Sequence, residues 1–282
     1  MLFRSLRDGR VVAAASLSGE GARMRITPVQ GDALDVDMGA VLALHGAAVE
    51  ANRLPAAWLG GGEVVRGLLV GGDAGGETLE LQSAVFGRWT VRVDRLDCLS
   101  FGGVEPGLLE LPQGSEEVLF QKATVGFDRW VGSVHQFGEG GIRFQSEGQK
   151  EPRWYSVREI AGLRLRGVEG SKLVPDAEVL TRSGDRVRVQ VTGWQQGSLV
   201  LKLEDGRAWP LPLKDLGCLQ MLGGGVVFAS DLTPSEAKET SPDSEVLLPW
   251  QRDRSVTGTA LAAGGFAHAR GLGVHSQSRL TF

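Results

Sequence analysis

The sequence has few of the residues that mark a disulfide scaffold or a zinc site. It contains only two cysteines, Cys98 and Cys218, and four histidines in 282 residues. This excludes a disulfide-dense secreted scaffold and a cysteine-rich zinc site. Both cysteines precede a leucine at the same position of an internal repeat. We therefore expect two buried thiols in different repeats that act as small hydrophobic groups and do not form a disulfide.

Long hydrophobic runs and an excess of one charge are missing as well. No apolar run approaches the roughly 20 residues of a membrane span, and the start, MLFRSLRDGR, lacks the apolar core of a signal peptide. The formal net charge of −4 is spread over mixed-sign segments, which provides no clustered basic face for nucleic acid. We expect neither a membrane span nor a nucleic-acid partner. The compartment stays open, with an extracytoplasmic or cell-surface location favoured if a signal sequence precedes Met1.

The short motifs of common catalytic sites are also missing. The sequence has no Gly-x-Ser-x-Gly, no His-Glu-x-x-His and no phosphate-binding loop ending in Gly-Lys-Ser/Thr. Its 34 acidic residues lie mostly in turns or alternate with arginine, as in VRVDRLD and KLEDGR, so no carboxylate pair stands out for glycoside hydrolysis. We expect no catalytic residues, and an enzyme only through a domain outside this chain.

Glycine is abundant and the strand pattern is clear. The 41 glycines are about double the usual share of roughly 7%, whereas 42% hydrophobic and 23% charged residues are ordinary for a globular protein. Val187, Val189 and Val191 alternate with polar residues and are followed by a glycine turn. Period-two alternation bounded by Gly and Asp is typical of half-buried strands. The sequence therefore predicts an all-β fold.

Residues 1–225 contain an internal repeat. Three segments share an ending in which a tryptophan begins an alternating strand and a leucine begins a second one: GRWTVRVDRLDCLSFGG, PRWYSVREIAGLRLRG and RAWPLPLKDLGCLQMLGG. The leucines are Leu99, Leu163 and Leu219, and a degraded copy around Val41 lacks the tryptophan. About five short strands in each copy predict tandem SH3-like or Sm-like barrels that pack on one another. The predicted repeats are residues 1–50 (degraded), 51–108, 109–170 and 171–225.

The repeated tryptophans, Trp89, Trp154 and Trp209, have two interpretations. A tryptophan that enters a strand of a small barrel usually fills its core, and we expect this role. The alternative is a row of aromatic platforms on which sugars or bases stack.

The chain changes character after the repeats. Leu232–Glu245 is polar, holds two prolines and is predicted to be a surface loop or linker. Residues 226–282 contain VVFASDL, DRSVTGTAL and GGFAHARGLGVHSQSRLTF in that order. They resemble the NPCBM/NEW2 module, a carbohydrate-binding-type module associated with glycoside hydrolase family 98. Its most specific part here is Gly-Leu-Gly-Val-His-Ser, preceded by Arg270.

The resemblance implies a jelly-roll-like β-sandwich in a bacterial protein. Such a fold needs on the order of 100 residues, and 57 follow Gly225. We therefore expect the N-terminal part of the module, in a fragment of a longer protein. The implied partner is a glycan, and no cofactor is expected, although the family allows calcium.

Three residues are candidate sugar contacts: Trp250, Arg270 and His275. An exposed indole can stack on a pyranose ring while charged neighbours bond its hydroxyls. A tryptophan in such a stretch is more often a core or interface residue, and a histidine such as His275 more often fixes the glycine turn or the start of the strand. Glycine turns of this kind, without a following helix, do not predict a phosphate site.

Other polar residues nearby have less specific roles. Ser230 and Asp231 can bind sugar hydroxyls or calcium, but such residues more often cap a turn. His268 and His275 lack a third ligand at a suitable spacing, so we expect no metal site.

The leading hypothesis is a non-catalytic carbohydrate-binding protein in which the barrels act as a scaffold. A second hypothesis is a structural scaffold that binds proteins and no sugar. A third, an Sm-like nucleic-acid binder, would show salt-dependent RNA binding.

Overall fold

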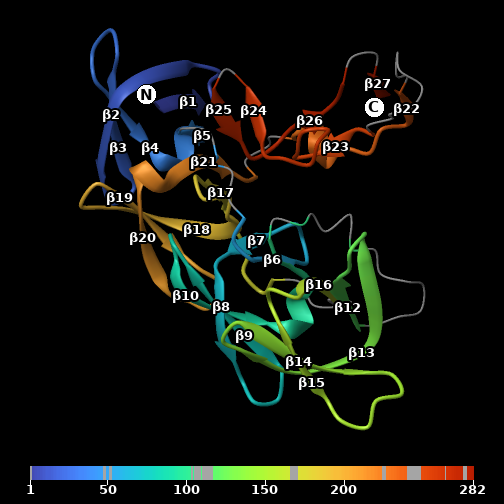
Figure 1. Ribbon diagram of the computed structural model, residues 1–282. Coiled ribbons are helices and arrows are strands. Elements are labelled where there is room, and N and C mark those ends of the chain that lie inside the picture. The colour runs from blue at the N-terminus through green and yellow to red at the C-terminus, as the bar shows by residue number, and fades with distance from the viewer. Residues whose placement is uncertain are drawn as a thin grey trace. The chain divides into compact units, whose positions relative to one another are not determined.

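The computed structural model describes residues 2–46, 49–50, 53–102, 104, 109, 117–165, 171–223, 227–239, 249–263, 265–275 and 278–282. These residues form strands joined by turns and by three-residue 3-10 helices (Figure 1). The predicted all-β class is thus confirmed. Among the described residues, no helix has the length and hydrophobicity of a membrane span.

The chain divides into two compact units. The first contains Met1–Glu50, Leu173–Arg182 and Arg188–Phe282, and the second contains Ala51–Lys172 and Ser183–Val187. Each unit therefore combines segments that are not consecutive in the sequence.

The first unit contains two sets of five strands. One set is β1 (Leu2–Leu6), β2 (Val11–Glu20), β3 (Arg23–Pro28), β4 (Leu34–Asp37) and β5 (Val41–His45). The other is β17 (Ala177–Thr181), β18 (Arg186–Gln195), β19 (Ser198–Lys202), β20 (Ala208–Pro212) and β21 (Leu216–Met221), of which β18 begins in the second unit. A 3-10 helix precedes the fifth strand of each set: η1 (Met38–Ala40) and η4 (Leu213–Asp215).

The second unit contains two more sets with the same plan. One set is β6 (Ala56–Leu59), β7 (Val64–Arg66), β8 (Leu68–Gly72), β9 (Thr78–Ser83), β10 (Gly87–Arg92), η2 (Val93–Arg95) and β11 (Leu96–Ser100), in which β7 and β8 together take the second place. The other is β12 (Glu117–Lys122), β13 (Phe127–Gly138), β14 (Gly141–Ser146), β15 (Arg153–Ser156) and β16 (Ile160–Leu165).

The strand pairing is the same in all four sets. The first strand pairs antiparallel with the fifth in β1–β5, β6–β11, β12–β16 and β17–β21. The third strand pairs with the second and the fourth, as β14 does with β13 and β15. The division into repeats at 1–50, 51–108, 109–170 and 171–225, and the closure of each set into an SH3-like or Sm-like barrel, stay predictions.

The fifth strands join the sets in pairs. In the first unit β5 pairs antiparallel with β21, and Leu44 lies opposite Leu219. In the second unit β11 pairs antiparallel with β16, and Leu99 lies opposite Leu163. All four leucines are fully buried. Each of these two pairings of fifth strands, called a seam below, is therefore an apolar contact between equivalent residues.

The register revises one detail of the predicted repeat. Val41 is the first residue of β5 and follows η1, just as Leu96 is the first residue of β11 and follows η2. The residue equivalent to Leu99 is therefore Leu44, three positions later than the sequence pattern suggested. The first copy lacks the tryptophan that marks the strand in the others, so its pattern was aligned to the wrong hydrophobic residue.

Both cysteines are buried and neither is in a disulfide, as expected. Cys98 lies on β11 in the second unit, and Cys218 lies on β21 in the first. They are small hydrophobic residues of two different cores.

The predicted core role of the repeated tryptophans is wrong for Trp154, whereas Trp89 and Trp209 lie on the core face of their strands. Trp89 and Trp209 are only half-buried, and Trp154 is 50% exposed. The core position of the fourth strand is instead taken by Val91, Leu211 and Tyr155, which stand just before the turn or 3-10 helix in their sets. Trp89 and Trp209 lie two residues earlier on the same face, at the start of the strand, where that face is partly open to solvent. Trp154 directly precedes Tyr155, so the alternation of side chains directs it to the opposite, outer face.

The C-terminal residues form short two-stranded ladders. These are β22 (Glu236–Glu239) with β27 (Ser278–Thr281), β23 (Gln251–Arg252) with β26 (Leu272–Gly273), and β24 (Leu261–Ala263) with β25 (Phe266–His268); η5 (Ala229–Asp231) precedes them. The polar stretch Leu232–Glu245 was predicted to be a loop, yet it contains β22. Pairing with β27 supplies the hydrogen bonds that the local sequence did not indicate.

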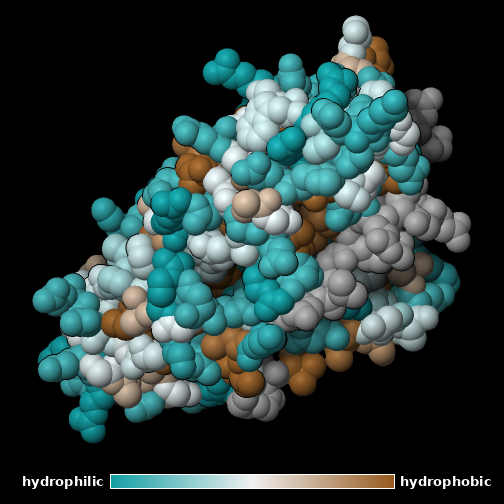
Figure 2. Space-filling view, turned by 90° about the horizontal axis from the view of Figure 1, so that it is seen from below, coloured by the Kyte–Doolittle hydropathy of each residue, from teal (hydrophilic) through white to brown (hydrophobic). Residues whose placement is uncertain are grey.

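The β24–β25 hairpin packs on the first unit's fifth strands. Ala267 and Ala269 are buried in one apolar cluster with Leu180 and Cys218. The surface is otherwise mostly hydrophilic on the face seen in Figure 2, where hydrophobic residues form separate small patches. Such scattered apolar residues are normal for a globular protein.

Candidate functional site

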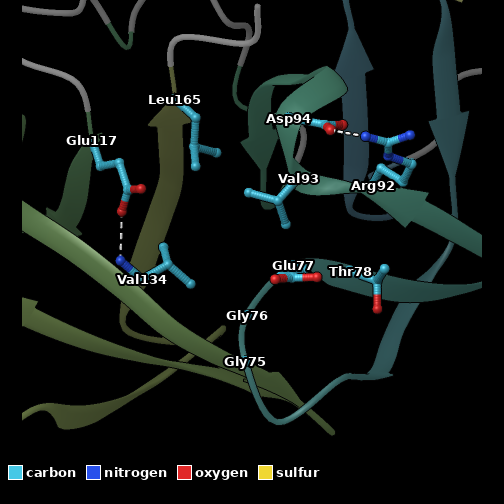
Figure 3. Close-up of a pocket in the computed structure, with 10 residues that line it drawn as sticks. All are labelled: Gly75, Gly76, Glu77, Thr78, Arg92, Val93, Asp94, Glu117, Val134 and Leu165. Carbon is cyan, nitrogen blue, oxygen red and sulfur yellow. Dashed lines mark hydrogen bonds and ion pairs between the residues drawn. The ribbon is translucent and has the colours of Figure 1, made fainter. Parts of the chain in front are cut away.

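A pocket in the second unit has a volume of about 930 Å³. In Figure 3, Gly75 and Gly76 run along its lower edge, Glu117 and Leu165 lie to one side, and Arg92 and Asp94 lie to the other. Its wall is completed by Glu77, which directly precedes β9, and by residues of β9, η2 and β13: Thr78, Val93 and Val134. Pockets of this size hold small ligands in many proteins.

Several polar groups of the pocket take part in bonds that stabilise the fold. The Val134 amide donates to the Glu117 carboxylate, and Asp94 forms an ion pair with Arg92. The Thr78 hydroxyl donates to Asp73 at 2.9 Å, and the Thr78 amide bonded to the same carboxylate lowers the pKa of Asp73. The ten lining residues include no histidine, cysteine or serine.

Arg270 is the centre of an ion network in the C-terminal segment. Its Nη1 lies 2.9 Å from Asp231 Oδ1 and 3.3 Å from Asp253 Oδ2, and its Nη2 lies 3.6 Å from Glu178 Oε2. The arginine side chain is 12% exposed and that of Glu178 is 3% exposed. Pairing with opposite charges offsets the cost of burying such groups. The network ties the C-terminal segment to β17.

Asp253 and the two glycines after Arg270 explain the geometry of the Gly-Leu-Gly segment. The Asp253 carboxylate accepts a hydrogen bond of 3.0 Å from the Gly271 amide. A Cβ at Gly273 would lie 2.0 Å from the Arg254 carbonyl oxygen, so only glycine fits there. The segment is therefore more than the turn that we expected, since Leu272 and Gly273 form β26 against β23.

Trp250 is half-buried and precedes β23. Its backbone amide donates to the Glu239 carboxylate, and the Arg252 guanidinium lies 5.7 Å from the centre of its ring. Arg252 is held there because it donates to the Leu232 carbonyl at 3.0 Å. An indole and a positioned guanidinium thus lie together at this surface.

His275 is half-buried at the end of the Gly-Leu-Gly-Val-His segment, and its carbonyl accepts a hydrogen bond from the Ser278 amide. Arg270, in contrast, has its guanidinium committed to carboxylates of the protein itself. Neither arrangement tests sugar contact, so the assignments of Trp250, Arg270 and His275 stay predictions.

The carboxylates near Arg270 do not offer a calcium site. Asp231, Asp253 and Glu178 surround a guanidinium, and Asp231 also accepts from the Phe228 amide in the turn that it was expected to cap. Within the described ranges, no three His, Cys, Asp or Glu side chains are grouped to hold a metal ion. The calcium that the resemblance allows stays a prediction that this network does not support.

His268 contacts a second histidine. The rings of His268, on β25, and His45, on β5, have centroids 4.6 Å apart, and His45 Nδ1 lies 3.0 Å from the Ala267 carbonyl oxygen and 3.5 Å from Cys218 Sγ. Burial lowers the pKa of His45, the bond to Ala267 raises it and the charge of His268 lowers it further, with a net decrease. The sequence pattern paired His268 with His275, whereas the fold pairs it with His45.

This cluster predicts a pH dependence of stability. Because the folded protein holds the pKa of His45 below the value of 6.5 of the free side chain, the unfolded chain binds a proton more readily as the pH falls through 6.5. The free energy of unfolding is therefore expected to decrease between pH 7.5 and pH 5.5, as measured by urea unfolding. His45→Gln should make this decrease smaller, and His135→Gln, at an exposed position, should leave it unchanged. An equal decrease in His45→Gln and the wild-type protein would exclude His45 as the cause.

Comparison with known families identifies one region. The NPCBM/NEW2 domain model matches residues 225–282, which confirms the resemblance of this segment. No curated protein and no solved structure matches the chain.

Proposed function

We propose that the chain is a non-catalytic carbohydrate-binding protein whose C-terminal residues capture a saccharide. The observation that carries the proposal is the match of residues 225–282 to the NPCBM/NEW2 domain.

Trp250 and Arg252 are the proposed centre of the sugar site. The apolar C–H face of a pyranose ring stacks on an indole, and a guanidinium donates to its hydroxyls. The distance of 5.7 Å between the Arg252 guanidinium carbon and the Trp250 ring centre places both groups within reach of one sugar ring. His275 is proposed as a further hydrogen-bonding contact, and Arg270 as the residue that holds Asp253 and the Gly-Leu-Gly segment in place.

The four sets of strands are proposed to act as a scaffold. Each unit joins two sets through a seam of buried leucines, which suits a rigid support. A purely structural role that binds proteins and no sugar is the second candidate, favoured by the same seams. The glycoside hydrolase family 98 association and the bacterial origin belong to this proposal as implications of the resemblance.

Trp250→Ala is expected to weaken saccharide binding about tenfold or more, because loss of an aromatic anchor removes upwards of about 1.4 kcal/mol. The measurement is retardation of the full chain in native gels that contain soluble glucan, galactan, xylan or mucin. Trp130→Ala is the matched control, since Trp130 is 39% exposed in the other unit. If Trp250→Ala changes thermal stability but not retardation, Trp250 is a structural residue and the site lies elsewhere.

A further inference from the structure

The outer face of β13–β14–β15 carries an exposed tryptophan in a row of polar side chains. Trp154 lies opposite Arg143, which lies opposite Gln136 across three paired strands. The neighbouring row, Phe137, Ile142 and Tyr155, is buried. Because adjacent residues of a strand face opposite sides of the sheet, the row of Trp154 faces solvent.

Two glycines support the indole ring of Trp154. A Cβ at Gly141 would lie 2.4 Å from its Cε2 atom, and a Cβ at Gly138 would lie 2.7 Å from its Cη2 atom. These distances are shorter than any real contact, so a side chain at either position would displace the ring. The indole therefore lies across β13 and β14 at the place that side chains would otherwise occupy, and the residue is 50% exposed.

Neither the core nor the internal repeat accounts for this arrangement. The buried place in β15 belongs to Tyr155, which packs edge-to-face against Phe144 at 6.4 Å. Trp154 is one residue out of step with Trp89 and Trp209 and lies on the other face of its strand. Glycine within strands weakens them and often marks a site of close approach. The arrangement thus presents an exposed indole beside the polar side chains of Arg143 and Gln136.

We propose that Trp154, Arg143 and Gln136 form a saccharide-binding site in the second unit, distinct from the C-terminal module. The flat open indole would stack on the C–H face of a pyranose ring with equatorial hydroxyls, as in glucose-type and xylose-type sugars. Arg143, which is exposed, and Gln136, which is half-buried, supply the planar donors and the amide acceptor that bond ring hydroxyls. The proposal does not depend on the proposed function of residues 225–282.

The test measures protection of individual tryptophans in the full chain. N-Bromosuccinimide oxidises exposed indoles, and peptide mass mapping gives a rate for each tryptophan with and without soluble oligosaccharides of β-linked glucose, xylose or galactose. Saturating sugar is expected to slow oxidation of Trp154 about tenfold while Trp130 is unaffected, because occupancy at tenfold above Kd leaves about one tenth of the site free. Trp250→Ala removes the other proposed site. The double variant Trp154→Ala, Trp250→Ala should bind the same sugar at least about tenfold more weakly than Trp250→Ala alone.

Two results would overturn the proposal. One is an unchanged rate of Trp154 oxidation with every sugar at millimolar concentration. The other is full affinity of the Trp154→Ala, Trp250→Ala double variant for a sugar that binds the wild-type chain. Loss of affinity in Trp250→Ala alone, with Trp154 unprotected, would support the C-terminal site and reject this one. Circular dichroism of Trp154→Ala checks its fold, which should be intact because the indole is on the surface.

Discussion

Arg270→Met is expected to lower the free energy of unfolding by about 3 kcal/mol, because removing one partner of a buried ion network leaves the others poorly compensated. Glu178 is the critical partner, since its side chain is 3% exposed and its other charged neighbour, Arg188, has its Nε 3.8 Å away. Asp253 loses a partner as well, although it keeps the bond from the Gly271 amide. The measurement is urea unfolding of the full chain followed by tryptophan fluorescence.

The matched control for this prediction is Arg279→Met. Arg279 is exposed on β27 of the same segment, and surface charges contribute about 0–1 kcal/mol. Hydrogen exchange should locate the Arg270→Met effect in β17 and in residues 249–275. A loss of stability no larger than that of Arg279→Met would show that the network is not a source of stability, and that Arg270 is available for another role such as sugar contact.

Leu163→Ala is expected to lower the free energy of unfolding by about 2–5 kcal/mol, the range for a fully buried leucine whose removal leaves a cavity. Leu163 is fully buried and lies between two partners, Leu99 on β11 and Leu119 on β12. The substitution therefore removes contacts with both neighbouring strands of β16, at the seam between the two sets of strands in the second unit. Circular dichroism during urea unfolding measures the change.

Leu68→Ala is the control for the seam, because Leu68 is a leucine of the same unit that is 55% exposed. It should change stability by no more than about 0.5 kcal/mol, as expected for a surface substitution. If Leu163→Ala is as mild as Leu68→Ala, the β11–β16 seam does not stabilise the unit, and its role as a rigid scaffold is wrong.

The all-β class and the resemblance to the NPCBM/NEW2 domain could be predicted from the sequence. The alternation of Val187, Val189 and Val191 predicted β18, and the first two of these are buried. The shared leucines predicted the fifth strands, which lie at the seams. The order of the C-terminal segments predicted the NPCBM/NEW2 match. The alternation of polar and apolar residues and the order of motifs depend only on the sequence, so they can be recognised without the tertiary structure.

The errors share a physical cause. Trp154 was aligned with Trp89 and Trp209 because all three precede an alternating strand, but a shift of one residue moves a side chain to the other face of a sheet. The strand β22 was missed since its polar residues are ordered by pairing with β27, which is distant in sequence. In both cases the deciding contact lies outside the window that a sequence pattern covers.

The candidate sites were divided in the same way. Trp250, Arg270 and His275 are candidates from the sequence and stay predictions, whereas the carboxylates around Arg270 and the contact of His268 with His45 could not be predicted from it. By itself, the sequence determined the all-β class and the match of residues 225–282 to the NPCBM/NEW2 domain. Both depend on the hydrophobic period and the order of motifs, which are properties of consecutive residues. Only the tertiary structure decided which tryptophan is exposed on glycines and which carboxylates surround Arg270, since strand register and long-range pairing bring those groups together.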